Sequence, residues 1–167
     1  MKTTINEIRN DNLRLGVSGL GGWLILIQIG LYLTLIGLII LIRDSFYNYS
    51  DEIWQLLSTE GTIYYHPLWR PIFIFESIYN ILFFIFTITI LVQFYRKKSI
   101  VPRLMIIFYS LSLLIGIFDY IMMQQIPLAR ELEAASSIRD LIKSTVTCLI
   151  WIPYFLKSER VMNTFVR

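Results

Sequence analysis

The stretch WLILIQIGLYLTLIGLIILI, residues 23–42, decides the fold of this chain. It contains no charged residue, the uncharged run reaches back to Leu15, and Arg43 and Asp44 follow it directly. A helix rises about 1.5 Å per residue, so roughly 20 apolar residues cross the roughly 30 Å of hydrocarbon in a bilayer. Because backbone polar groups in lipid must be satisfied internally, the run predicts a membrane-spanning helix over about residues 16–42.

The composition of the whole chain is that of a membrane protein. Of its 167 residues, 56% are hydrophobic and 16% are charged, the mean hydropathy is +0.61 and the net charge is +3. A soluble domain is about 45–50% apolar and about 25% charged. These values exclude a disordered chain, a nucleic-acid-binding domain and an ordinary cytosolic enzyme. The single Cys148 excludes a disulfide framework or a cysteine-based zinc site.

Three further apolar segments predict three more spans, at about residues 71–95, 102–125 and 137–157. The last is the most polar, and Ser137 is its expected N-cap. Leaving it outside the bilayer would expose the apolar run VTCLIWIPYFL, residues 146–156, to water. We therefore predict one all-α domain over residues 1–167, a polytopic membrane protein built as a four-transmembrane-helix bundle.

The distribution of basic residues predicts how the bundle is oriented. Ten of the 15 Lys and Arg residues lie in the N-terminal tail, at the link between the second and third spans (up to Arg103), and in the tail that begins at Lys157. The positive-inside rule places these segments in the cytoplasm. Four spans also return the chain to the side on which it starts. We expect a protein of the bacterial cytoplasmic (inner) membrane with both termini inside.

The first outer loop, residues 43–70, is rich in aromatic residues of the kind that lie at headgroup level. Residues 50–61 predict a short helix in it, with Ser50 as the cap and Gly61 as the stop. This helix is either an interfacial element or a lid over the bundle, and we favour the interfacial interpretation.

Ionisable residues within the spans are the candidate functional residues, because charge is costly in hydrocarbon. Glu76, Asp119 and Lys143 fall at similar depths on three different spans, and Asn80 follows Glu76 by one helical turn. We predict a polar cluster of these four residues open to the outer side. It is either a structural salt bridge, which we favour, or a site for a solute, cation or proton.

Small residues and the C-terminal stretch suggest contacts between segments. Gly30, Thr34 and Gly37 lie on nearly one face of the first span and predict close packing within the bundle, the alternative being a homodimer seam. Pro153 predicts a kink in the last span. Residues 158–165 form a short cationic end that either lies on the inner membrane surface, which we favour, or docks under the bundle.

Motifs of enzymatic chemistry are missing from the sequence. No Ser, Thr or Cys has an evident base partner, and His66, the one histidine, has no second ligand nearby. The Gly-rich turn before Trp23 lacks the pattern of a nucleotide-binding loop. We therefore predict no catalytic, cofactor-binding or metal-binding residues, and we do not expect an enzyme.

Two end motifs carry a resemblance to a known family. The stretch GLGGWLIL at residues 19–26 and the residues WIPYF, SERV and TFV between 151 and 166 resemble the bacterial family called domain of unknown function 2569, as does YHPLW at 65–69. The likeness covers about residues 16–166. It implies a small integral membrane protein with about four spans and transfers no catalytic residue. It adds weight to six motif positions: Trp23, Trp151, Pro153, Ser158, Arg160 and Phe165.

The expected function is that of a non-enzymatic accessory or interaction component, which binds lipid and a partner membrane protein or another copy of itself. The alternative is a small ion- or proton-coupled transporter that uses Glu76 and Asp119. An intramembrane enzyme acting on lipid is disfavoured, because it would need a nucleophile–base pair or metal ligands. A role in immunity to a pore-forming toxin also fits a small helical membrane protein and has no motif of its own.

Overall fold

A computed structural model describes residues 18–48 and 52–166, apart from the side chains of Ile53 and residues 133–135. This part of the chain is all-helical, with no strand. Its helices are α2 (Trp23–Asn48), α3 (Glu52–Ser58), α4 (Trp69–Tyr95), α5 (Val101–Met123), α6 (Pro127–Lys157) and α7 (Glu159–Thr164).

Three of these helices, α2, α4 and α5, are long and apolar enough to cross a membrane. The fourth long helix, α6, has 31 residues and is more polar than the others. Large apolar side chains cover the outside of the bundle, including Leu33, Leu114 and Leu149, which are 63–69% exposed. Such a surface is costly in water and suits contact with lipid chains.

The prediction that Ser137 caps the last long helix is wrong. Helix α6 begins at Pro127, directly after Ile126, whose backbone is extended. Proline suits the first position of a helix, because its missing N–H would have no helical partner there. Ser137 therefore lies inside the helix, and the charged residues beside it belong to the helix body.

The outer-loop helix is shorter than expected, because α3 ends at Ser58 and Gly61 lies in the turn that follows, with φ +95°. The expected cap, Ser50, lies outside the described residues. The Trp54 ring lies 4.6 Å from that of Phe73, centre to centre, so α3 packs against the beginning of α4.

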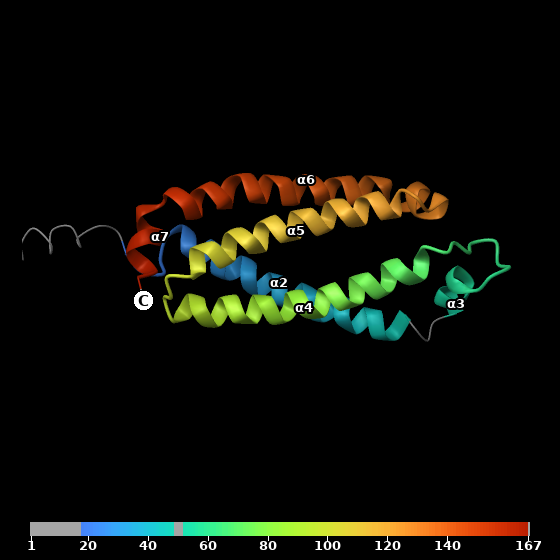
Figure 1. The fold of residues 1–167 in the computed structure, drawn as a ribbon, viewed down its shortest axis with the longest axis horizontal. Coiled ribbons are helices and arrows are strands. Elements are labelled where there is room, and N and C mark those ends of the chain that lie inside the picture. Colours follow the sequence, from blue (N-terminus) through green and yellow to red (C-terminus); the bar gives the residue numbers. More distant parts are fainter. Residues whose placement is uncertain (1–17, 49–51, 167) are drawn as a thin grey trace, which may run out of the picture.

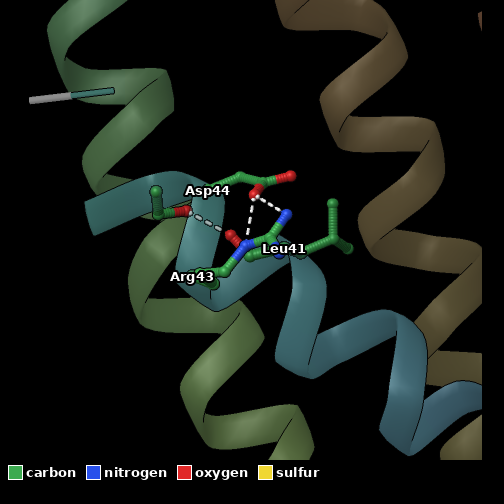
Figure 2. A network of polar contacts seen from close by, with 4 residues as sticks. Leu41, Arg43 and Asp44 are labelled. Atoms are coloured by element: carbon green, nitrogen blue, oxygen red, sulfur yellow. Dashed lines mark hydrogen bonds and ion pairs between the residues drawn. The ribbon is translucent and has the colours of Figure 1, made fainter. Parts of the chain in front are cut away.

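Helix α2 extends past the predicted end of its apolar run, to Asn48. The two charged residues lie within the helix, where Arg43 donates two hydrogen bonds, of 2.9 and 2.7 Å, to one oxygen of Asp44 (Figure 2). Ser45 Oγ donates to the Leu41 carbonyl at 2.9 Å, so its hydroxyl is satisfied within the helix. The ion pair carries no net charge and is compatible with further helical turns at the membrane edge.

The long helices form two pairs, α2 with α4 and α5 with α6, and α4 touches α5 less extensively (Figure 1). At one end of the molecule α7, the start of α2 and the α4–α5 connection come together, and α3 lies at the other end. The main buried core lies toward the first of these ends, which we call the closing end, and includes Phe94, Met105, Phe155, Val161 and Phe165.

Candidate functional site

Adjoining half-open cavities separate the helix pairs on the side of the molecule away from the closing end. Their volumes are about 520, 380 and 200 Å³. All three are lined by Ser144, and the two larger ones share Glu76, Asp119 and Asp140. We call this space the polar groove and define it by these lining residues: Glu76, Asn80, Ser112, Asp119, Asp140, Lys143, Ser144 and Thr147.

Helix α6 contributes a polar stripe to the groove. Ser137, Asp140, Ser144 and Thr147 line its cavities and follow one another at intervals of three or four residues. That spacing places them on one face of a helix. The polarity of α6 is therefore concentrated on a face that looks into the groove.

The carboxyl groups of Glu76 on α4 and Asp119 on α5 line the same two cavities and lie close enough to interact. Two neighbouring carboxyl groups can share a hydrogen bond only when one carries a proton, so we expect this pair to take up a proton. The neighbouring rings of Phe75 and Phe118, 4.9 Å apart, bring the two helices together here. Asp119 Oδ1 is buried and has no hydrogen-bond partner in the part of the chain that the structure describes.

Lys143 does not lie between the two carboxyl groups. Its Nζ atom donates to Asp140 Oδ1, three residues earlier on the same helix, at 2.9 Å. The structure thus brings Glu76 and Asp119 together with the buried Asn80, and Lys143 lines the adjacent cavity with Asp140 as its partner. Within the described ranges, no three His, Cys, Asp or Glu side chains are placed to hold one metal ion.

Asp140 is the charged groove residue that was not predicted from the sequence, and the uncharged Ser112, Ser144 and Thr147 were not predicted either. With the helix expected to start at Ser137, Asp140 belonged to its first turn, where a charge at the membrane surface is ordinary. The signal that could have identified it is the regular spacing of polar residues along α6, from Ser137 to Thr147.

A shared hydrogen bond between Glu76 and Asp119 predicts a difference between two substitutions of Asp119. Asp119→Asn keeps a group that can donate to Glu76, and we expect it to change the free energy of unfolding by less than about 1 kcal/mol. Asp119→Ala removes the hydrogen bond and should lower that free energy by about 1–3 kcal/mol. Thermal unfolding in mild detergent, with Glu76→Gln as the reciprocal variant, measures both. Equal losses for the alanine and asparagine variants would contradict the shared bond.

The closing end assembles the two sequence motifs from the ends of the chain. Gly19 N donates to Thr164 Oγ1 at 2.9 Å, and the Thr164 hydroxyl donates back to the Gly19 carbonyl oxygen at 3.3 Å. Ring contacts join Trp23 to Trp151, at 6.3 Å, and Phe94 to Phe165, at 5.1 Å. Residues far apart in the sequence therefore hold this end closed.

The favoured expectation that residues 158–165 lie on the membrane surface is wrong, because they dock against the bundle. Ser158 Oγ accepts from Val161 N and caps α7. Val161, Thr164 and Phe165 are at most 5% exposed. Apolar burial against the core outweighs contact with the surface. Pro153 lies inside α6, which continues past it to Lys157.

Arg160 lies over the glycine-rich turn before α2. A Cβ atom at Gly21 would lie 3.3 Å from Arg160 Nη1, and one at Gly22 would lie 3.3 Å from Arg160 Cζ. Gly22 also has φ +61°, a conformation that favours glycine. The absence of a Cβ atom at these two positions leaves room for the guanidinium group of Arg160.

The close packing expected at Gly30 and Gly37 is not found. Among the described residues, no heavy atom outside the helix's own backbone lies within 4 Å of a Cβ at either position. Thr34 Oγ1 donates to the Gly30 carbonyl oxygen, so its hydroxyl is satisfied within α2. This face of α2 is open.

Comparison with known proteins matches one family model, described as protein of unknown function (DUF2569), to residues 17–166. No curated protein and no solved structure matches the chain. The match covers both end motifs and all of the membrane-spanning helices.

Proposed function

The chain belongs to the DUF2569 family, whose function is unknown, and on this premise we propose that it is a non-enzymatic interaction component of the bacterial cytoplasmic membrane. In this proposal the polar groove receives a transmembrane helix of a partner protein, and that helix carries a Lys or Arg residue.

The proposed topology has four spans with both termini in the cytoplasm. Helix α6 supports it, because it runs beside α5 and directs its polar stripe into the groove. Cys148 Sγ lies 3.2 Å from the Tyr109 carbonyl oxygen, which fixes the two helices side by side. The basic α4–α5 connection and α7 lie at one end, as a cytoplasmic closing end requires (Figure 1).

The exposed ion pair of α6 is the observation that carries the proposal. The side chains of Asp140 and Lys143 are 70% and 67% exposed, although they lie 17 and 14 residues before Lys157, or roughly 21–26 Å along the helix. With Lys157 at one membrane face, the pair lies within the bilayer. Charged side chains at such depth face protein or water rather than lipid. A partner helix would supply that cover.

The charge balance of the groove indicates the chemistry of the partner. Glu76, Asp119 and Asp140 line the groove with one lysine, Lys143, and we expect the Glu76–Asp119 pair to hold a proton of its own. A cationic side chain from the partner could replace this proton and pair with the acids. Ionisable residues within membranes usually pair with one another in this way.

A small ion- or proton-coupled transporter is the second candidate, and the neighbouring carboxyl groups of Glu76 and Asp119 favour it. Proton carriers need a carboxyl group that can take up and release a proton within the membrane. The buried core at the closing end, including Phe94 and Phe155, would have to rearrange to extend this groove across the bilayer. A transporter therefore requires a rearrangement of the buried core that an interaction component does not require.

Site-specific cross-linking in native membranes tests the proposal. In a Cys148→Ser background, Ser144→Cys places a thiol in the groove and Leu149→Cys places one on the outer surface of the same helix. With a photoactivatable thiol reagent, we expect an adduct at position 144 and none at 149. Mass spectrometry of the adduct should identify an apolar segment with a Lys or Arg residue.

Neutralising the groove is the matched test of its charge. We expect the triple variant E76Q/D119N/D140N, in the Ser144→Cys background, to lose the adduct while keeping its unfolding temperature within a few degrees. Adducts of equal yield at 144 and 149, or an adduct that survives neutralisation, would contradict the proposal. An adduct between differently tagged copies of this chain would make the partner a second copy. No adduct at 144, together with proton flux in liposomes that Glu76→Gln abolishes, would favour the transporter.

A further inference from the structure

The closing end carries a group of basic residues. We call this group the basic end: Arg96, Lys97, Lys98, Arg103, Lys157 and Arg160. In the described part of the chain, the ion pairs are Arg43–Asp44 and Asp140–Lys143, and neither involves the basic end. Glu159 is the acidic residue that the described segments contribute near it. Within residues 18–48 and 52–166, the positive charge of this surface is therefore left largely uncompensated.

Arg160 is held in one place and forms no ion pair with the residues that the structure describes. The hydrogen bonds between Thr164 and Gly19 and the burial of Val161 fix α7, and Arg160 lies against Gly21 and Gly22. A fixed guanidinium group offers a planar set of donors that matches a phosphate, and a preorganised one loses little entropy on binding.

Lys97 keeps a cation at a position where glycine is usual. Lys97 N donates to the Phe94 carbonyl and Lys98 N to the Gln93 carbonyl, which is the hydrogen-bond pattern of a helix end with a left-handed residue. Lys97 is that residue, with φ 53°, the one positive φ outside glycine in the described residues. Lysine is strained there relative to glycine. A charge that binds a ligand would offset this strain.

Aromatic rings place the basic end at the depth of lipid headgroups. Trp23 is 63% exposed and contacts Trp151 edge to face, and it follows the glycines that Arg160 covers. Tryptophan is enriched where hydrocarbon meets the headgroups. A phosphate at that level belongs to a lipid.

We infer that the basic end binds the phosphate headgroup of an anionic phospholipid, with Arg160 as the direct ligand and the lysines of the α4–α5 connection as supporting charges. The site is separate from the polar groove. It does not depend on the partner helix proposed above.

Thermal unfolding of the purified full chain tests this site, in nonionic detergent mixed with phosphatidylcholine or with phosphatidylglycerol. We expect phosphatidylglycerol to raise the unfolding midpoint by about 5 °C over phosphatidylcholine, because a ligand of the folded state stabilises it. Arg160→Gln should lose most of this increment. Arg160→Lys, which keeps the charge without the planar group, should lose part of it. Arg130→Gln, the same change of charge at the exposed start of α6, should keep it.

Lys97→Gly separates charge from backbone strain. In phosphatidylcholine we expect this variant to unfold about 2 °C above wild type, because glycine accepts the left-handed conformation. Its increment in phosphatidylglycerol should be smaller than that of wild type.

Three results would overturn the site: a full increment in Arg160→Gln, an equal loss in Arg130→Gln, or the same rise from inorganic phosphate in place of phosphatidylglycerol. If Arg160→Gln does not fold, the increments of Arg160→Lys and Lys97→Gly in phosphatidylglycerol test the site in its place. Unchanged increments in both would then overturn it.

Discussion

Phe94→Ala is expected to lower the free energy of unfolding by about 3 kcal/mol or more. The Phe94 side chain is fully buried and meets the ring of Phe165, so it joins α4 to the docked segment that follows α7. Removing a buried phenyl ring leaves a cavity that close-packed neighbours fill only in part, which typically costs about 3–5 kcal/mol. The loss should loosen the closing end more than the rest of the bundle.

Unfolding in mixed micelles measures this effect, and hydrogen exchange at residues 158–165 locates it. Ile85→Ala is the matched control, because Ile85 lies on the same helix and is 56% exposed. We expect that control to lose less than about 1 kcal/mol. Similar losses for the two variants would show that Phe94 is not part of a packed core.

Gly22→Val is expected to lower the free energy of unfolding by about 2 kcal/mol or more. Its φ of +61° is unfavourable for any residue with a Cβ and most of all for a β-branched one, at about 1–2 kcal/mol. The added side chain would also displace Arg160, whose Cζ atom lies 3.3 Å from the Cβ position. The substitution would therefore disrupt both the turn before α2 and the position of the Arg160 guanidinium group against that turn.

Gly30→Ala is the control for this substitution, since Gly30 is helical and has open space around it. Alanine in a helix interior is better than glycine by up to about 1 kcal/mol, so this variant should be as stable as wild type or more stable. Chemical unfolding of both variants in the same detergent gives the comparison. A Gly22→Val protein as stable as Gly30→Ala would mean that the turn before α2 has another conformation.

The membrane-spanning helices could be predicted from the sequence because a single property decides them. An apolar run of sufficient length becomes a helix in lipid, so the expected span at 71–95 differs from α4, Trp69–Tyr95, by two residues. The beginning of α6 could not be predicted in the same way. Polar residues from Pro127 onward fit a loop as well as a helix until their neighbours are known, and the expected cap at Ser137 was one of several equivalent local choices.

The groove shows the same limit for side chains. Sequence gives the depth of Glu76, Asp119 and Lys143 along their helices, but each helix can rotate about its own axis. Depth therefore placed the three residues in one layer without showing which of them would meet. Asp140 lies three residues before Lys143 on the same helix and forms an ion pair with it. Lys143 was expected to pair with Glu76 and Asp119 instead.

The docked C-terminal segment depended on contacts that no local pattern contains. Its alternation of charged and apolar residues suits a membrane surface and the underside of a bundle equally well. Burial of Phe165 against Phe94 makes the difference, and these residues belong to segments separated by two long helices. The resemblance carried by both end motifs indicated that the ends matter, without indicating that they touch.

The hydrogen bond between Gly19 and Thr164 joins residues 145 positions apart, and α7 follows every long helix in the sequence. Before the ribosome has made α7, the long helices can enter the membrane and pair, but the hydrogen bonds between Gly19 and Thr164 cannot yet hold the two pairs together at the closing end. The contact between Gly19 and Thr164 is therefore the last of these contacts to form. A nascent bundle is therefore open at both ends during insertion, and a truncation that removes α7 would leave it permanently in that immature state.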